Sequence, residues 1–145
     1  MFAKRTARIL YVEDDADTRE FVSYVLTHAH YEVVVAESPD HAAHIAQTTS
    51  FDLYLIDNWM PGASGVELCG WLRRFDYNTP ILFLSGAAYE QDKRAAFAAG
   101  AQGYLTKPVA VEELVEEVSR LITTTRPVGD MESPRSTLAD EKCLI

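Results

Sequence analysis

The stretch FDLYLIDNWMPGASG, residues 51–65, places an acidic residue directly after an apolar run and just before a Pro-Gly turn. The run FDLYLI (51–56) has the composition of a strand that lies in a protein core. A carboxylate at the tip of such a strand is normally either a turn former or a chemical group, because an unpaired buried charge is costly. The role of Asp57 therefore depends on what the rest of the chain brings beside it.

Four further apolar runs recur along the chain, with helical patterns between them. Alternation of this kind predicts an α/β protein with a parallel sheet that helices cover on both faces. The runs are ARILYV (7–12), YEVVVA (31–36), PILFLS (80–85) and GYLT (103–106). Together with residues 51–56 they predict a doubly wound sheet of five strands.

Five helices are expected between and after these strands. Ser38 is predicted to be the N-cap of the second helix with Pro39 at its first position, and Gly100 is predicted to end the fourth. The expected ranges are 17–30, 39 to about 48, a helix after Ser64, about 90–99, and 109–122.

The length of 145 residues and a hydrophobic content of 48% fit one domain with an ordinary core. We assign this domain to residues 1–122. The remainder, 123–145, has mixed charge, two prolines and no sustained apolar period, which predicts a flexible C-terminal tail.

Charge and cysteine content narrow the expected partners. A net charge of -9 argues against a nucleic-acid or anionic-membrane partner, because both would repel an acidic surface. The two cysteines form neither a disulfide framework nor a zinc motif, so a reducing cytoplasm fits best. No apolar run approaches the roughly 18 residues of a membrane span.

The polar residues that follow the strands are expected to meet in one crevice. In a doubly wound sheet of strand order 2-1-3-4-5, the first and third strands are neighbours and ligands bind outside the carboxyl ends. Glu13 and Asp14 would then face Asp57, and crowded carboxylates of this kind indicate Mg²⁺ or Mn²⁺. Lys107 and Ser85 at the neighbouring strand ends suit a phosphoryl group, with Asp57 as its acceptor.

Four segments, in order and each at a strand end, resemble the signature segments of the receiver domain of bacterial two-component response regulators. Receiver domains of this family, which include chemotaxis regulators, have a flavodoxin-like fold. The resemblance covers about residues 7–122. The segments are ILYVEDD (9–15), LIDNWMPGASG (55–65), FLSG (83–86) and YLTKP (104–108).

The resemblance implies a role for each matching residue. Asp57 would accept a phosphoryl group from a histidine kinase or a histidine phosphotransfer protein, with Ser85 and Lys107 contacting that group. Asp14, Asp57 and the backbone carbonyl of Trp59 would bind Mg²⁺ directly, and Glu13 would hold a metal-bound water. Tyr104 would be the switch aromatic, and the Lys107–Pro108 peptide bond would be cis.

The function that follows is a phosphorylation-dependent switch, not an enzyme, whose protein-binding face changes for a downstream target protein. Two alternatives remain open: a flavodoxin-like small-molecule-binding domain, and a receiver fragment of a larger hybrid kinase. At the residue level, Asp57 could be only a turn residue, Asp14 to Asp17 could cap the first helix, and Ser85 could cap the fourth.

Two further positions concern the lifetime of the phosphoaspartate. The resemblance implies that residues 59 and 87 flank the path of the hydrolytic water. Trp59 offers only an indole N–H and Ala87 has no polar atom, so neither can orient that water. We therefore predict a long-lived phosphoryl group.

Overall fold

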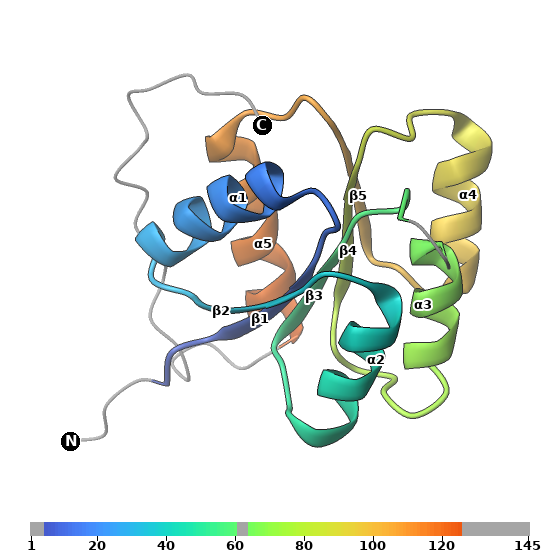
Figure 1. Ribbon diagram of the computed structural model, residues 1–145, viewed down its shortest axis with the longest axis horizontal. Coiled ribbons are helices and arrows are strands. Elements are labelled where there is room, and N and C mark those ends of the chain that lie inside the picture. The colour runs from blue at the N-terminus through green and yellow to red at the C-terminus, as the bar shows by residue number, and fades with distance from the viewer. Residues whose placement is uncertain (1–4, 61–63, 126–145) are drawn as a thin grey trace.

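A five-stranded parallel sheet forms the centre of the computed structural model, which describes residues 5–60 and 64–125 (Figure 1). The strand order is β2-β1-β3-β4-β5, as predicted, and the α/β fold class is confirmed. The strands are β1 (Arg8–Val12), β2 (Glu32–Ala36), β3 (Leu53–Ile56), β4 (Ile81–Ser85) and β5 (Gly103–Thr106).

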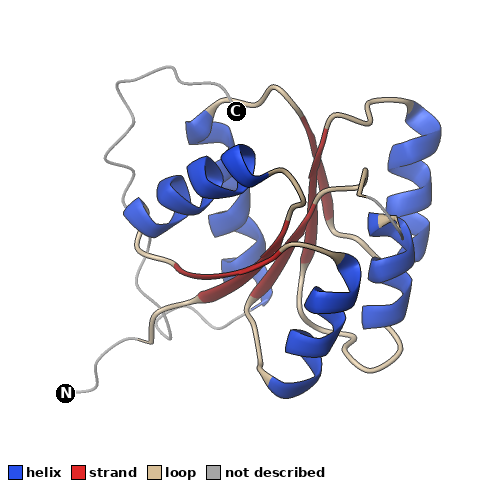
Figure 2. Ribbon diagram, in the orientation of Figure 1, coloured by secondary structure: helices blue, strands red, loops and turns tan. Residues whose placement is uncertain are grey.

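Five helices cover the two faces of this sheet (Figure 2). One layer holds α1 and α5, and the opposite layer holds α2, α3 and α4. The helices are α1 (Ala16–His28), α2 (Pro39–Thr48), α3 (Gly65–Leu72), α4 (Glu90–Ala99) and α5 (Val111–Thr125).

Burial on both faces explains why the strands read as continuous apolar runs. In β1, Ile9 and Tyr11 pack in the core beneath α1 and α5, while Leu10 and Val12 pack in the core beneath α2, α3 and α4. Side chains alternate between the two faces of a strand, so a strand covered on both sides needs apolar residues at every position.

The helix ends follow local capping chemistry. The side chain of Ser38 accepts a hydrogen bond from the His41 N–H, and Ser64 accepts one from the Glu67 N–H, each satisfying a free donor of the first turn. Gly100 ends α4 with a φ of 116°, a conformation that glycine adopts without steric cost. These bounds agree with the predicted ones.

The last helix is shifted relative to the prediction, because it begins at Val111 and not at Val109. It continues to Thr125, three residues past Ile122, and its threonine hydroxyls donate to carbonyls one turn earlier. Threonine is a weak helix former, which is why the sequence pattern placed the end of the helix at Ile122. The rest of the predicted tail, residues 126–145, lies outside the described residues.

Within the described ranges, no helix combines the length and the apolar character that crossing a bilayer requires.

Candidate functional site

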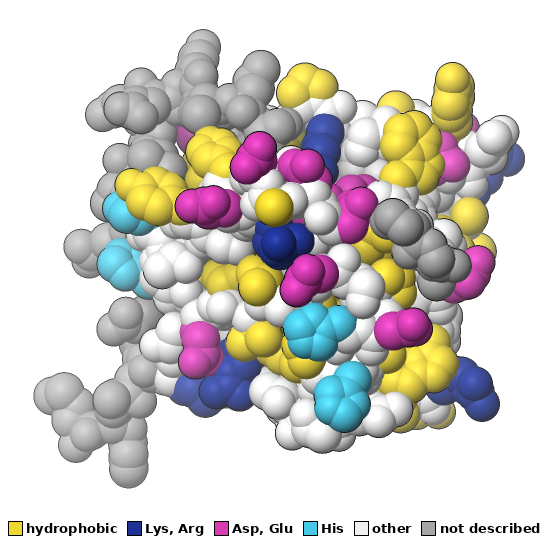
Figure 3. Space-filling view, in the orientation of Figure 1, with side chains coloured by type: hydrophobic (Ala, Val, Ile, Leu, Met, Phe, Trp, Pro, Cys, Tyr) yellow, Lys and Arg dark blue, Asp and Glu magenta, His cyan; other side chains and the backbone are white. Residues whose placement is uncertain are grey.

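Three carboxylates meet beyond the carboxyl ends of β1 and β3. The parallel pairing aligns Val12 with Ile56, so the residues that follow these strands emerge side by side. Glu13, Asp14 and Asp57 each offer one carboxylate oxygen, and these oxygens all lie within 4.8 Å of one another. Acidic side chains gather near the middle of this face of the molecule, around a basic one (Figure 3).

Position 65, where α3 packs against the backbone of Asp57, requires a residue without a side chain. A methyl group at Gly65 would lie 2.6 Å from the carbonyl oxygen of Asp57, closer than such atoms approach. Glycine therefore lets the first turn of α3 pack directly against the backbone of the β3–α3 loop. Asp57 is 7% exposed and Glu13 is 1% exposed, whereas Asp14 is open to solvent.

Lys107 supplies the positive charge of the cluster. It follows β5, and its Nζ donates to Oε1 of Glu13 at 2.9 Å and lies 3.8 Å from Oδ2 of Asp57. Its backbone N–H donates to the carbonyl of Ser85, which ties the ends of β4 and β5 together. The Lys107–Pro108 peptide bond is cis, as the resemblance implies.

Glu13 accepts hydrogen bonds from further donors that no motif in the sequence singles out, both at its carboxylate and at its backbone carbonyl. The hydroxyl of Tyr11 donates to Oε1 of Glu13 at 3.3 Å, and the N–H of Asp15 donates to Oε2 at 3.3 Å. Arg19 of α1 donates to the backbone carbonyl of Glu13 at 2.9 Å. The strand period of two places Tyr11 and Glu13 on the same side of the chain, a signal that was available in the sequence.

Ser85 lies at the end of β4 and is fully buried. Its Oγ accepts a hydrogen bond from the N–H of Ala87 at 3.2 Å. The alternative that Ser85 caps the fourth helix is wrong, because the N-cap is Tyr89, whose N–H donates to Asp92. Ser85 thus lies at the strand end, where its carbonyl accepts from the N–H of Lys107.

Tyr104 points toward the β4–α4 loop. Its ring stacks on Phe83 with centroids 5.5 Å apart, and its hydroxyl donates to the carbonyl of Ala87 at 2.6 Å. Burial, the largest cause, raises the pKa of Tyr104 above its usual value. The hydroxyl is consequently a proton donor at neutral pH, and it connects β5 to the loop that follows Ser85.

Trp59 lies at the mouth of the site. Its backbone N–H donates to Oδ1 of Asp57 at 3.2 Å, and its side chain is 61% exposed. A methyl group at Gly86 would lie 3.9 Å from Cζ3 of the indole, so the ring reaches the loop after β4. Ala87, which the resemblance places beside the water path, is fully buried.

The donor set fits a hard divalent cation. Mg²⁺ and Mn²⁺ prefer carboxylate oxygens and keep several water ligands, and the three clustered oxygens with exposed Asp14 offer both. The backbone carbonyl of Trp59, which the resemblance adds to this ligand set, stays a prediction.

Other acidic and histidine side chains stay outside the cluster. The carboxylate of Asp15 accepts from the N–H and hydroxyl of Thr18, so Asp15 is the N-cap of α1. These hydrogen bonds lower the pKa of Asp15. His41 and His44 lie exposed on α2, and in the part of the chain that the structure describes the only group of clustered metal-ligand side chains is Glu13, Asp14 and Asp57.

Known proteins resemble this chain in sequence and in fold. The sequence model of the family described as "Response regulator receiver domain" matches residues 9–119. The chain is 42% identical over 107 residues to the transcriptional regulatory protein YrkP of Bacillus subtilis, and 36% identical over 128 residues to the phosphate regulon transcriptional regulatory protein PhoB of Pseudomonas aeruginosa. These alignments cover 74% and 87% of this chain, but only 46% of YrkP and 56% of PhoB.

Among solved structures, the response regulator TrrA of Thermotoga maritima in complex with Mg²⁺-BeF matches with a TM-score of 0.74 and 30% identity. That match covers 80% of this chain and 99% of the TrrA chain. The chain thus spans about half the length of the curated relatives and aligns with nearly all of the TrrA chain. Because the family match extends over most of the described residues, this protein belongs to the response regulator receiver domains.

Proposed function

We propose that this receiver domain is a signalling switch in which Asp57 accepts a phosphoryl group from a histidine kinase or a histidine phosphotransfer protein. The observation that carries the proposal is the cluster of Glu13, Asp14 and Asp57, whose oxygens lie within 4.8 Å of one another beside Lys107. Phosphoryl transfer requires mainly positioning and neutralisation of charge, and this cluster with a divalent cation supplies both.

In the proposed reaction a carboxylate oxygen of Asp57 attacks the phosphorus atom of a phosphohistidine. An O–P bond forms, the N–P bond breaks, and the imidazole leaves with the electron pair. Mg²⁺ held by Asp14 and Asp57 would neutralise charge on the phosphoryl oxygens and on the carboxylates. The related protein TrrA was solved in complex with Mg²⁺-BeF, which supports this choice of ion.

Lys107 and Ser85 are the proposed contacts of the phosphoryl group. Lys107 Nζ already lies 3.8 Å from Oδ2 of Asp57, within reach of an oxygen added there. The Ser85 hydroxyl donates to a phosphoryl oxygen once it turns toward the crevice, which releases the N–H of Ala87. That turn would alter the loop to which Tyr104 is bonded.

The output we propose is a change in the surface formed by the β4–α4 loop and Tyr104, read by a downstream protein. The names of YrkP and PhoB describe transcriptional regulation by proteins about twice as long as the matched region. A DNA-directed output is therefore a proposal for a longer protein, while the net charge of -9 argues against direct DNA contact by this chain. We also propose a cytoplasmic location, because the proposed phosphoryl donor is a histidine kinase.

The test is incubation of the purified chain with Mg²⁺ and acetyl phosphate, followed by intact mass spectrometry. We expect the mass of one phosphoryl group to be added to the wild type and none to Asp57→Asn, because an amide oxygen is a poor nucleophile. Asp17→Asn is the matched control, because Asp17 is an exposed acid of α1 outside the cluster. Equal labelling of Asp57→Asn and wild type would reject Asp57 as acceptor.

A further inference from the structure

Tyr11 lies behind the carboxylate cluster, in the core beneath α1 and α5. Its side chain is fully buried, and its hydroxyl donates to Oε1 of Glu13 at 3.3 Å. A phenol has one proton to donate, and in this hydrogen bond that proton is directed at Glu13.

The two donors on Oε1 of Glu13 differ in their freedom to move. Lys107 has a flexible side chain, is 21% exposed, and lies near both Glu13 and Asp57. Tyr11 has a rigid ring that the surrounding core holds on every side. When Lys107 turns toward a phosphoryl group on Asp57, Tyr11 is the side-chain donor that stays on Glu13.

We propose that Tyr11 is a positioning residue of the divalent-cation site and keeps the Glu13 carboxylate in place independently of Lys107. This inference rests on the proposed function, because it needs the cation and the phosphoryl group. Mg²⁺ demands near-octahedral geometry. If the Glu13 side chain moved along with Lys107 when the lysine turns toward the phosphoryl group, it would hold a metal-bound water poorly. Outer partners of metal-site residues typically change metal affinity by about 10–100-fold when they are removed.

The test compares two phenol deletions in the same sheet. Tyr11→Phe keeps the ring and removes only the hydroxyl. Tyr54→Phe is the matched control: Tyr54 is a buried strand tyrosine whose hydroxyl also donates to a carboxylate, that of Asp76, outside the cluster. We expect the calorimetric Kd for Mg²⁺ to rise about tenfold in Tyr11→Phe and to stay at the wild-type value in Tyr54→Phe.

Two further readouts separate positioning from a general structural effect. Phosphorylation by acetyl phosphate should need about tenfold more Mg²⁺ for half-maximal rate in Tyr11→Phe, with the maximal rate unchanged. In a Glu13→Ala background, Tyr11→Phe should have no additional effect on the Kd, because the side chain that it positions is gone. Thermal unfolding without Mg²⁺ verifies that each variant is folded.

The outcomes are distinguishable. If the wild type does not bind Mg²⁺ at all, the proposed function fails. If the wild type binds and Tyr11→Phe binds equally well or more tightly, only the role of Tyr11 is overturned. If Tyr11→Phe weakens Mg²⁺ binding equally with and without the Glu13 side chain, the role of Tyr11 is also overturned, because the effect would then not act through Glu13.

Discussion

At the scale of single residues, Trp59 lies exposed beside Asp57, the proposed phosphoryl acceptor. Its indole lies beside Gly86, so it bridges the loops that follow β3 and β4. Hydrolysis of a phosphoaspartate needs a water in line with the phosphorus, and an indole has no acceptor with which to orient that water. Ala87 is buried, which leaves Trp59 as the exposed position of the two.

We expect Trp59→Asn to shorten the lifetime of phospho-Asp57 by about tenfold, a barrier change of about 1.4 kcal/mol. The amide is smaller than the indole and can both donate and accept hydrogen bonds to water. Loss of phosphate is followed by intact mass after removal of the phosphodonor, in excess Mg²⁺. Trp59→Phe, which keeps an aromatic ring without polar atoms, is the control and should lose phosphate as slowly as the wild type.

An unchanged lifetime in Trp59→Asn would mean that this side chain is not what limits hydrolysis. Replacing Ala87 is not a suitable companion experiment. A polar group there would enter the core, and the Ala87 backbone already binds Tyr104 and Ser85.

At the scale of elements, the connection between α3 and β4 is fixed by one carboxylate. Asp76 accepts hydrogen bonds from the hydroxyl of Tyr54 at 2.8 Å, and from the hydroxyl and N–H of Thr79 at 2.8 and 3.1 Å. Burial acts to raise the pKa of Asp76, but the hydrogen bonds from Thr79 and Tyr54 outweigh it, and the pKa is lowered.

Asp76→Ala is expected to lower the free energy of unfolding by about 1–3 kcal/mol, because the buried hydroxyl of Tyr54 loses its acceptor. A lowered folded-state pKa contributes stability above the unfolded-state value of about 3.8, and this contribution is lost as the pH falls through the folded-state pKa. Urea unfolding at neutral and acidic pH measures both effects.

The stability difference between wild type and Asp76→Ala should therefore narrow in acid. Glu116→Ala, at an exposed position of α5, is the control and should change little at any pH. A difference that widens as the pH falls would contradict the assigned role of the Asp76 carboxylate.

The elements themselves could be predicted from the sequence because their signals are local. Strands covered on both faces read as apolar runs, and Ser38, Ser64 and Gly100 mark helix ends by chemistry that acts within one turn. The end of α5 was placed too early because threonines carry no helix signal, although their hydroxyls bond to the preceding turn.

The candidate site was predictable only in part. The predicted site residues lie at or just after strand ends, and the strand order brings them to one edge. They are Glu13, Asp14, Asp57, Ser85 and Lys107. The strand period places Tyr11 and Glu13 on the same side of the chain, but it does not show that their side chains bond. The packing of Trp59 near Gly86 depends on side-chain positions that no local pattern encodes. The burial of Ala87 likewise depends on how the β4–α4 loop folds back, which the sequence does not reveal.

At the scale of the whole molecule, the fold holds three acidic groups together at one edge, where they repel one another. A cation that binds this edge only in the folded chain must therefore stabilise the entire domain. At a Mg²⁺ concentration of about 100 times Kd, the free energy of unfolding should rise by about 2.7 kcal/mol.

Thermal unfolding with and without Mg²⁺ measures this coupling, with sodium chloride at matched ionic strength as the reference. In Asp14→Ala, Mg²⁺ should raise the free energy of unfolding far less, because few carboxylates hold the ion. An equal gain in Asp14→Ala would show that Mg²⁺ stabilises the chain elsewhere.

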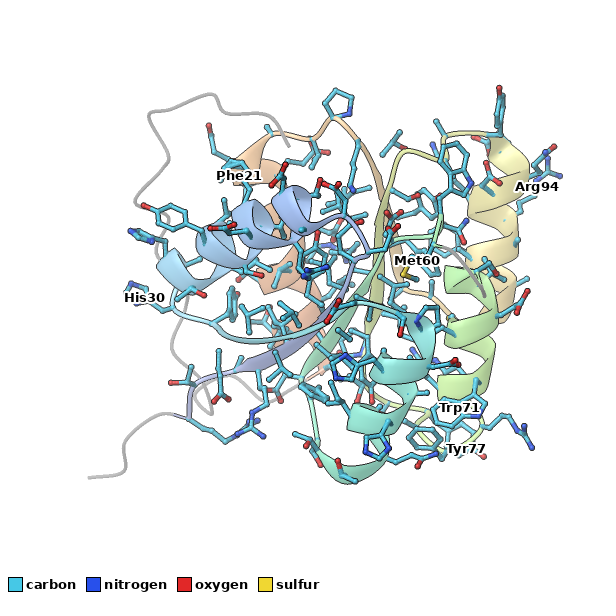
Figure 4. The ribbon with its side chains drawn as sticks, in the orientation of Figure 1. Phe21, His30, Met60, Trp71, Tyr77 and Arg94 are labelled. Carbon is cyan, nitrogen blue, oxygen red and sulfur yellow. The ribbon has the colours of Figure 1, made fainter. Side chains whose placement is uncertain are left out.

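The two tryptophans lie in very different surroundings. In the view of Figure 4, Trp71 lies near Tyr77 at the lower end of α3, well away from Met60, the residue after Trp59. Trp71 packs edge-on against Phe75, whereas the indole of Trp59 is open to water beside the proposed acceptor. The emission of Trp59 should respond to a charged group attached to Asp57 while that of Trp71 stays constant. We therefore expect Trp59 to act as a built-in optical reporter, with which phosphorylation of Asp57 can be followed in real time without a dye.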